Sequence, residues 1–373
     1  MSDKPRIMTV LGTRPEIIRL SRIIAKLDPL CEHLVIHTGQ NFDPELDEIF
    51  FRDLQVRRPD RYLNARGSFG EQMAVILPET EKIMHEFKPE RLLILGDTNS
   101  SIAGIMAKRL KIPLFHMEAG NRCFDFNVPE EINRRIIDHI ADVNLAYSEN
   151  SRRYLLDEGL PQDRTFVSGS PMREVLTHYA KKIEKSSALA DLDVEPGRYF
   201  LASLHREENV DFPKRLDELL AALDAIARRY KLPVIVSTHP RTRKRLESDR
   251  TGSAGRVRFC KPFSFTDYVC LQKSARCVIS DSGTISEESA ILRFPAVTIR
   301  DAIERPEAID EGSIIVTGVD RENILRCVDV AIETASDACP EAYNVTNTSD
   351  RVLRIILGYI RYVNQRVWRK GTL

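Results

Sequence analysis

The sequence lacks an excess of either charge. Its 55 Lys and Arg residues balance 55 Asp and Glu residues, which argues against a protein that binds nucleic acid or a membrane surface. It has no uncharged apolar run of the roughly 18 residues that a membrane-spanning helix needs. The opening segment turns polar soon after "IMTVL", which predicts a buried first strand and not a signal peptide. We therefore expect a cytoplasmic protein.

Motifs for cofactors and metals are also missing. The chain contains neither GxGxxG nor the P-loop pattern GxxxxGKS or GxxxxGKT, which argues against a nicotinamide cofactor and a P-loop nucleotide. HExxH is absent, and the seven cysteines form no CxxC pair. We therefore expect no cofactor and no metal, and we interpret the cysteines as reduced thiols within the core.

The sequence does contain an alternation of short apolar runs and helical patterns. In the first half, the runs are "RIMTVLG", "HLVIHTG", "ERLLILGD" and "IPLFHME", and the alternation restarts at "RYFLASLHRE". This pattern indicates βαβ units, because parallel strands that are buried on both faces read as continuous apolar runs. The length suits about two domains. We predict an α/β fold of two Rossmann-like, doubly wound domains that face a cleft.

A charged segment near residues 170–195 interrupts this alternation. The predicted boundaries are 1–172 for the first domain, 173–195 for a hinge, 196–348 for the second domain and 349–373 for one long helix that packs back toward the first domain. The last segment is predicted as a helix because its apolar residues recur with helical spacing.

Polar residues follow many of the predicted strands. Because ligands of open parallel sheets bind beyond the carboxyl ends of the strands, these positions are candidates for a site. They are Arg14, Gln40, Asp97, Glu118, His205, His239, Asp281, Ser282 and Gly283. A single Asp after a strand is more often a helix cap than a catalyst, but several such strand ends together favour a shared site.

The segment "DSGTISEES" is the clearest phosphate-binding pattern. A strand ends, small residues follow and a helix begins, so that free backbone N–H groups favour an anion. Ser282 and Thr284 add hydroxyl donors, while Arg300 and Arg305 in the following "RDAIERPEA" suit a diphosphate through their planar forks of donors. An ordinary helix N-cap explains the motif equally well, and Glu288 could either cap the helix or reach the hydroxyls of a ribose.

Eight segments together point to a known family. In order along the chain they are "GTRPEII", "HTGQN", "LGDTNS", "HMEAGNR", "VPEEINRR", "LHREEN", "SDSGTISEES" and "RDAIERPEA". In these segments the chain resembles the non-hydrolysing UDP-N-acetylglucosamine 2-epimerases. The resemblance implies a GT-B fold, a homodimer, and inversion at C2 of a UDP-linked 2-acetamido sugar without NAD or a metal. It also implies a cytoplasmic role in supplying surface polysaccharide.

The resemblance assigns roles to particular residues. It implies that Asp97, Glu118 and Glu130 are catalytic acids and that His205 is the essential histidine. Inversion needs a proton to leave one face of C2 and another to arrive at the opposite face, which several acids can serve better than one. Arg134, one helical turn after Glu130, can orient that carboxylate. The substrate-binding candidates are Arg14, Gln40, Arg134, His239, Ser282, Gly283, Thr284, Glu288 and Arg305.

Four departures from the commonest family form leave the sugar open. Arg19 stands where Lys is usual, Thr284 where a second Gly is usual, and Ser286 where Gln is usual. The histidine segment reads "STHPRTRKR", whereas it usually continues toward Asn-Pro. These departures resemble the subgroup that forms UDP-N-acetyl-L-fucosamine, so that reaction is an alternative to the interconversion of UDP-GlcNAc and UDP-ManNAc. A GT-B glycosyltransferase and a non-catalytic nucleotide-sugar sensor are the alternatives from other classes.

Overall fold

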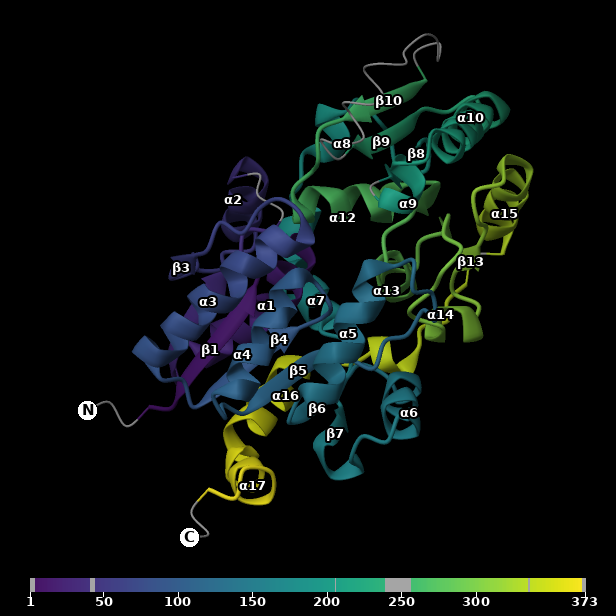
Figure 1. Cartoon of the computed structure of the whole chain (residues 1–373). Helices are drawn as coiled ribbons and strands as arrows, with labels where there is room; N and C mark the ends of the chain where they lie inside the picture. Colours follow the sequence, from purple (N-terminus) through teal and green to yellow (C-terminus); the bar gives the residue numbers. More distant parts are fainter. Residues whose placement is uncertain (1–3, 41–43, 205, 239–255, 335, 371–373) are drawn as a thin grey trace. The chain divides into compact units, whose positions relative to one another are not determined.

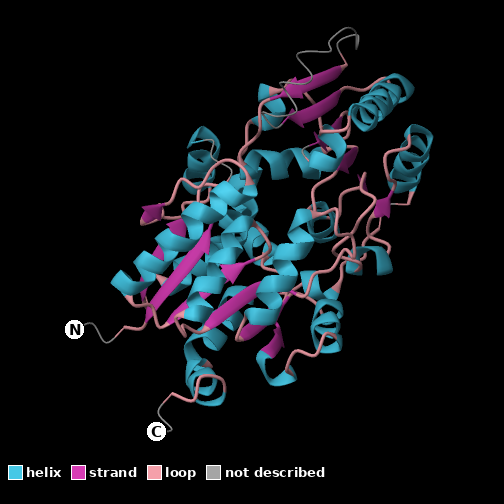
Figure 2. Ribbon diagram, in the orientation of Figure 1, coloured by secondary structure: helices cyan, strands magenta, loops and turns pink. Residues whose placement is uncertain are grey.

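The computed structural model describes residues 4–40, 44–204, 206–238, 256–334 and 336–370. The chain divides into two compact units. Unit 1 contains Met1–Thr177 and Ala342–Leu373, and unit 2 contains His178–Glu341. Figures 1 and 2 show that each unit is a sheet with helices packed around it. None of the helices in the described ranges is long and apolar enough to cross a membrane.

Unit 1 is built on a seven-stranded sheet in the order β3-β2-β1-β4-β5-β6-β7, and all of its strand pairs are parallel. The strands are β1 (Arg6–Leu11), β2 (Glu32–His37), β3 (Arg61–Tyr62), β4 (Arg91–Leu95), β5 (Leu114–Ala119), β6 (Val143–Ala146) and β7 (Thr165–Val167). Apart from Arg6, every residue of β1, β4 and β5 is buried, which explains their continuous apolar runs. The order reverses between β1 and β4, as in a doubly wound sheet.

The helices of unit 1 are set by local signals and by packing. They are α1 (Arg14–Leu27), α2 (Pro44–Asp53), α3 (Phe69–Phe87), η1 (Asn99–Ile102), α4 (Ala103–Arg109), α5 (Pro129–Ile140), α6 (Glu149–Asp157), η2 (Gln162–Arg164) and α7 (Met172–Glu184), which ends in unit 2. A capping box of Ser68 and Glu71 starts α3, which continues through Pro78. Packing of Ile76 and Ile83 into the apolar core offsets the cost of that proline.

The C-terminal segment differs from the prediction of one helix over 349–373. The structure has two helices, α16 (Thr348–Gly358) and α17 (Ile360–Arg366), after the short η3 (Glu341–Tyr343). The break follows Gly358, a residue with low helix propensity. The prediction of a single helix was therefore wrong. The apolar periodicity of the sequence continues past Gly358, but the helix is interrupted there.

Contacts hold the C-terminal segment in unit 1, and Figure 1 shows α16 and α17 in yellow beside the elements of that unit. α16 packs against α1, where Lys26 Nζ lies 2.6 Å from Asp350 Oδ1. Arg91, at the start of β4, donates a 2.8 Å hydrogen bond to the backbone carbonyl of Ile356. The segment thus completes unit 1.

Unit 2 is built on a six-stranded parallel sheet in the order β10-β9-β8-β11-β12-β13. Its strands are β8 (Phe200–Leu204), β9 (Val234–Thr238), β10 (Val257–Cys260), β11 (Cys277–Ser280), β12 (Ala296–Thr298) and β13 (Ile315–Val316). Its helices are α8 (Ala188–Asp191), α9 (Glu207–Val210), α10 (Pro213–Tyr230), α12 (Phe265–Ser274), α13 (Ile285–Leu292), α14 (Glu307–Asp310) and α15 (Arg321–Glu333). Leu219, Leu223 and Ile226 of α10 pack into one apolar cluster with the central strands. The predicted α/β class, with two doubly wound sheets, is confirmed.

The division of the chain falls near the predicted boundaries at 172 and 348. The two units separate between Thr177 and His178 and again between Glu341 and Ala342. The segment predicted as a hinge, 173–195, contains most of α7 and all of α8. A hinge function for this segment stays a prediction.

Candidate functional site

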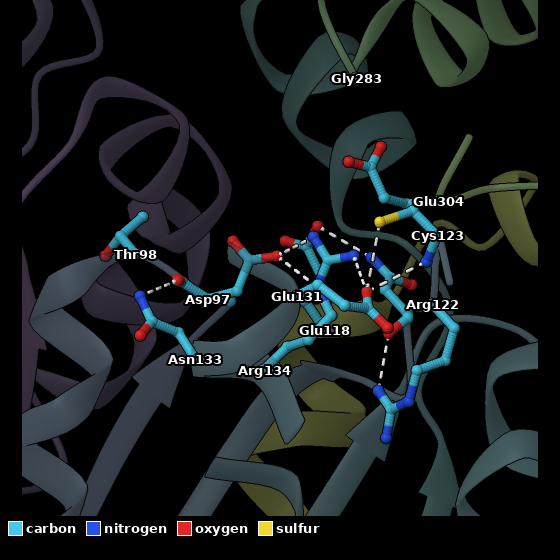
Figure 3. A network of polar contacts seen from close by, with 12 residues as sticks. Asp97, Thr98, Glu118, Arg122, Cys123, Glu131, Asn133, Arg134, Gly283 and Glu304 are labelled. Atoms are coloured by element: carbon cyan, nitrogen blue, oxygen red, sulfur yellow. Dashed lines mark hydrogen bonds and ion pairs between the residues drawn. The ribbon is translucent and has the colours of Figure 1, made fainter. Parts of the chain in front are cut away.

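The carboxyl ends of the strands in unit 1 share one edge of the sheet, and an ion pair joins two of the predicted residues there. Asp97 follows β4, and Arg134 lies on α5. Arg134 Nε and Nη2 lie 2.9 and 2.5 Å from Asp97 Oδ2. Asn133 on the same helix donates a 3.0 Å hydrogen bond to the backbone carbonyl of Asp97 (Figure 3). The first turns of α5 therefore fix both the backbone and the side chain of Asp97.

Glu131 is a further member of this network that was not among the predicted site residues. Its side chain is fully buried, and it accepts hydrogen bonds from Arg134 Nη1 at 3.0 Å and from Arg135 Nε at 3.0 Å. It also accepts from the backbone N–H of Cys123 at 3.1 Å, as Figure 3 shows. Glu131 thus ties the loop before α5 to the arginine that holds Asp97.

Glu118 stands at an irregular point of β5. Its φ is +62°, and the register between β5 and β6 shifts between Met117 and Ala119. A bulge of this kind re-aims a side chain at the end of a strand. Arg19 Nη1 lies 2.6 Å from Glu118 Oε2, and Asn121 Nδ2 donates to Glu118 Oε1 at 3.2 Å. Both contacts present hydrogen-bond donors to the oxygens of the carboxyl group.

A second buried network supports the backbone on either side of these acids. His116 on β5 lies between the backbone carbonyl of Gly96, 2.9 Å from its Nε2, and Asp138, 2.9 Å from its Nδ1. Asp138 also pairs with Arg122 Nη1 at 2.7 Å, and Arg122 in turn pairs with Glu158. Burial tends to raise the pKa of Glu158, but the hydrogen bond and charge of Arg122 outweigh it and lower that pKa to about 2. Since Gly96 precedes Asp97, this network connects the two acid-bearing loops.

The other predicted residues of unit 1 occupy nearby elements. Glu130 is partly buried in the first turn of α5, next to Glu131 in sequence. Arg14 begins α1, and its guanidinium lies over the ring of Phe50, 5.7 Å from the centroid. Gln40 follows β2, and its side-chain oxygen is buried without a hydrogen-bond partner among the described residues.

In unit 2, Ser282, Gly283 and Thr284 form the turn between β11 and the start of α13. The Ser282 hydroxyl lies 3.0 Å from the Thr284 hydroxyl and accepts from the backbone N–H of Thr284 at 3.4 Å. Thr284 is the N-cap residue of α13 but makes no side-chain capping bond. Ser282 and Gly283 of this turn line a small pocket together with Arg300 and Arg305. These four predicted anion-binding residues therefore come together at one pocket, whereas Thr284 is not among the residues that line it.

The two arginines of this pocket each have a carboxylate partner. Arg305 Nη1 lies 2.6 Å from the backbone carbonyl of Gly283 and 3.0 Å from Glu287 Oε2. Arg300 donates to both oxygens of Glu304. The contact between Arg305 and Gly283 fixes the arginine directly at the turn.

Glu288 is 7% exposed and accepts a 2.6 Å hydrogen bond from Gln272 on α12. The structure therefore gives it a partner within unit 2, and contact with a ribose stays a prediction. His205 and His239, predicted as a catalytic and a substrate-binding residue, lie outside the described residues. Among the described residues, no group of three or more His, Cys, Asp or Glu side chains is placed to hold a metal ion.

Comparison with known proteins decides the family. The family model described as UDP-N-acetylglucosamine 2-epimerase matches residues 25–357. The chain belongs to the UDP-N-acetylglucosamine 2-epimerase family. This is a family of isomerases, so the expected resemblance and enzyme class are confirmed, and a glycosyltransferase or a sensor is not favoured.

Relatives in this epimerase family match almost end to end. The UDP-N-acetylglucosamine 2-epimerase of Methanocaldococcus jannaschii is 36% identical over 361 residues, covering 94% of this chain and 98% of the relative. The UDP-2,3-diacetamido-2,3-dideoxy-D-glucuronate 2-epimerase of Pseudomonas aeruginosa is 32% identical and covers 93% and 98% of the two chains. The family therefore includes epimerases of more than one UDP-sugar.

Solved structures of UDP-N-acetylglucosamine 2-epimerases are similar to this structure over almost the whole chain. The structure of UDP-N-acetylglucosamine 2-epimerase from Rickettsia bellii has a TM-score of 0.93 and 45% identity, covering 98% of this chain and 100% of the other. A structure of the Methanocaldococcus jannaschii enzyme in complex with UDP-GlcNAc and UDP has a TM-score of 0.89 and 35% identity, covering 94% and 99%.

Proposed function

We propose that this protein interconverts UDP-GlcNAc and UDP-ManNAc by elimination and re-addition of UDP. The observation that carries the proposal is the pair of acids, Asp97 and Glu118, each held by an arginine at the carboxyl edge of the unit 1 sheet. The names of the relatives favour UDP-GlcNAc over the UDP-N-acetyl-L-fucosamine alternative.

The chemistry at C2 accounts for the number of acids. The C2 hydrogen is not next to a carbonyl, so its removal is feasible only if the bond between C1 and the diphosphate oxygen breaks as well. A carboxylate takes the proton from C2, the electron pair of the C–H bond forms the C1=C2 double bond, and UDP leaves with the electrons of the C1–O bond. The resulting 2-acetamidoglucal regains a proton at the opposite face of C2 while UDP adds back at C1.

Three carboxyl groups of unit 1 can divide these proton transfers. We assign Asp97, Glu118 and Glu130 to proton removal and delivery, since inversion requires an ionised acid on one face and a protonated acid on the other. Arg134 and Arg19 keep Asp97 and Glu118 in fixed orientations. Such preorganisation is what proton transfer at a weakly acidic carbon requires.

The pocket of unit 2 supplies the site for the diphosphate. We assign the turn of Ser282, Gly283 and Thr284 to the phosphate oxygens, because it precedes the N-terminus of α13, where the helix dipole favours an anion, and carries two hydroxyls. Arg305 is fixed at this turn by the carbonyl of Gly283 and can stabilise the charge of the departing UDP. Arg14, Gln40, His205, His239 and Glu288 are proposed as further catalytic or substrate-binding residues on the family resemblance.

Incubation with UDP-GlcNAc alone in D2O, followed by proton NMR, tests the proposal. We expect UDP-ManNAc to form with deuterium at C2 and without an acceptor. Product that retains protium at C2 would contradict the elimination mechanism, while binding without turnover would favour a sensor. A parallel panel with UDP-2-acetamido-2,6-dideoxy-L-hexoses and a UDP-2,3-diacetamido sugar tests whether another sugar is the preferred substrate.

We also propose a homodimer and a cytoplasmic location, where the product would serve the synthesis of surface polysaccharide. The location is supported by the cysteines, because all seven are free thiols. Sedimentation of the purified chain tests the dimer, and fractionation of the source cells tests the location.

A further inference from the structure

Glu16 is a buried carboxyl group that no step of the proposed reaction uses. It lies in the first turn of α1 and is 1% exposed. Its Oε2 accepts from the backbone N–H of Gly12 at 3.0 Å and from the Thr13 hydroxyl at 2.7 Å. Its Oε1 accepts from the Thr98 hydroxyl at 3.2 Å. The side chain therefore bridges the loop after β1 and the loop after β4.

The contact with Thr98 reaches the residue next to Asp97. From the opposite side, α5 holds the same loop, because Asn133 Nδ2 donates to the carbonyl of Asp97 at 3.0 Å and to Asn99 Oδ1 at 3.1 Å. Figure 3 shows Thr98, Asp97 and Asn133 together. The acid-bearing loop is thus held between α1 and α5, and Glu16 makes the contact on the α1 side.

The backbone at Gly12, which donates to Glu16, is closely packed against its neighbours. A Cβ added to Gly12 would lie 2.0 Å from Thr38 Oγ1 and 2.2 Å from Ser100 Oγ, which are themselves hydrogen-bonded at 2.7 Å. The ends of β1, β2 and β4 therefore converge where only a glycine fits.

α1 also holds the second acid. Arg19 lies three residues after Glu16, so the two side chains project from neighbouring positions on the helix surface. Arg19 contacts Glu118, while Glu16 contacts Thr98 beside Asp97. One helical turn thus makes contacts to both acid-bearing segments.

We propose that Glu16 is a positioning residue that fixes the Asp97 loop relative to Glu118 through the first turn of α1. The inference rests on the proposed epimerase function for its kinetic consequence. Glu16 is too deeply buried to touch the sugar, so it acts through Thr98. Loss of the contact should shift Asp97 and slow proton transfer, because a displacement of about 1 Å at a catalytic group can cost roughly 10²-fold in rate.

The test compares Glu16→Ala, Glu16→Gln and Thr98→Val in the full-length chain. Glu16→Ala removes all three contacts and should lower kcat about 10²-fold, with the Kd for UDP within twofold of wild type. The amide of Glu16→Gln can still accept from Gly12 and donate to Thr98, so it should retain kcat within about tenfold. Thr98→Val removes the contact from its other end, and its effect on kcat should not add to that of Glu16→Ala.

Asp142→Asn is the matched control for general destabilisation. Asp142 is also a buried carboxylate of unit 1, but it lies before β6 and pairs with Lys108. This variant should lower Tm and leave kcat unchanged. If Glu16→Ala lowers Tm to a similar extent but keeps wild-type kcat, Glu16 is only structural and the proposal is wrong.

Hydrogen exchange of the peptide that covers residues 91–102 provides a readout that does not depend on activity. The amides of residues 97–102 should exchange faster in Glu16→Ala and Thr98→Val than in wild type, and at the wild-type rate in Asp142→Asn. Unchanged exchange in both loop variants overturns the positioning role. A wild-type protein that fails to convert UDP-GlcNAc overturns the proposed function instead, and the exchange experiment still decides the role of Glu16.

Discussion

Arg19 Nη1 lies 2.6 Å from Glu118 Oε2, and both side chains are almost completely buried. The two residues are 99 positions apart in sequence. Arg19 also lies over the ring of Tyr147, 5.8 Å from its centroid, so the guanidinium is held by more than its charge. A lysine at this position would keep the charge but not the planar contact with the ring.

Glu118→Gln should separate proton chemistry from binding. The amide keeps the size of the side chain but cannot ionise, so turnover should fall by roughly 10²–10⁴. The Kd for UDP should stay within a few-fold, because the proposed diphosphate contacts lie in unit 2. Steady-state kinetics and calorimetry measure the two quantities. Glu149→Gln, at an exposed side chain on α6, is the control and should change neither. Lost UDP binding with normal turnover at saturation would contradict the assignment of Glu118.

Glu131→Gln should reveal the buried charge network of α5. The change leaves Arg134 and Arg135 facing a neutral amide, and breaking a buried ion pair costs about 3–5 kcal/mol. The free energy of unfolding should fall by an amount near the lower end of this range, because the amide oxygen can still accept the hydrogen bonds from Arg134 and from the backbone N–H of Cys123. Urea denaturation measures it. The matched change Glu322→Gln, in an exposed pair with Arg321, should cost less than about 1 kcal/mol. If both variants lower the free energy of unfolding by the same amount, the buried contacts of Glu131 contribute no more to stability than an exposed ion pair.

Arg305 should contribute to UDP binding through its charge. Because Arg305 is buried against Glu287, a single Arg305→Ala change would leave that glutamate without this partner. The double variant Glu287→Gln/Arg305→Gln removes both charges, and Glu287→Gln alone is its reference. Loss of a charge-assisted hydrogen bond of about 1.5–3 kcal/mol should raise the Kd for UDP about tenfold or more in the double variant relative to the reference. If the double variant and Glu287→Gln bind UDP equally well, Arg305 does not contact the diphosphate and Arg300 becomes the candidate.

Glu16 should make stability depend on pH. Burial raises the pKa of its carboxyl from 4.5 to about 7, against the lowering effect of the hydrogen bonds from Thr13, Gly12 and Thr98. Between these values the folded protein holds a proton that the unfolded chain has released, so the free energy of unfolding falls as the pH rises from about 4.5 to 7. The loss is on the order of 3 kcal/mol.

Thermal unfolding of wild type and Glu16→Gln at pH 5 and pH 8 measures this dependence. The amide does not titrate, so the Tm of the variant relative to wild type should be higher at pH 8 than at pH 5. A difference in Tm that is the same at both pH values would show that Glu16 does not titrate in this range.

The regular elements could be predicted from the sequence because local patterns specify them. The apolar runs "RIMTVLG" and "ERLLILGD" predicted the strands that form β1 and β4, because strands buried on both faces produce continuous apolar runs. β3 was missed because a strand of two exposed residues has no periodicity. The break at Gly358 was missed because the apolar pattern continues through it.

From the sequence, only the site residues that follow strands or match the family motifs could be predicted. The sequence places Glu130 and Glu131 in the same helical turn, and only the packing of α5 determines that Glu131 is fully buried between Arg134 and Arg135. The contacts of Glu16 were likewise missed, because they join loops that are far apart in sequence. Packing in three dimensions therefore reveals the residues that position the acids.

The return of the C-terminal segment to unit 1 has a consequence for biosynthesis. Unit 2 is one continuous stretch, His178–Glu341, whereas unit 1 needs Ala342–Leu373 in addition to its N-terminal residues. On the ribosome, all of unit 2 is translated before α16 can reach α1. Unit 1, which contains the acid-bearing sheet, can therefore complete its folding only after residues 342–373 have been made. Until then, the surface of α1 that α16 covers is exposed and can bind chaperones. A truncated chain that ends at residue 341 and has been released from the ribosome should show unit 2 resistant to protease while unit 1 is still cleaved.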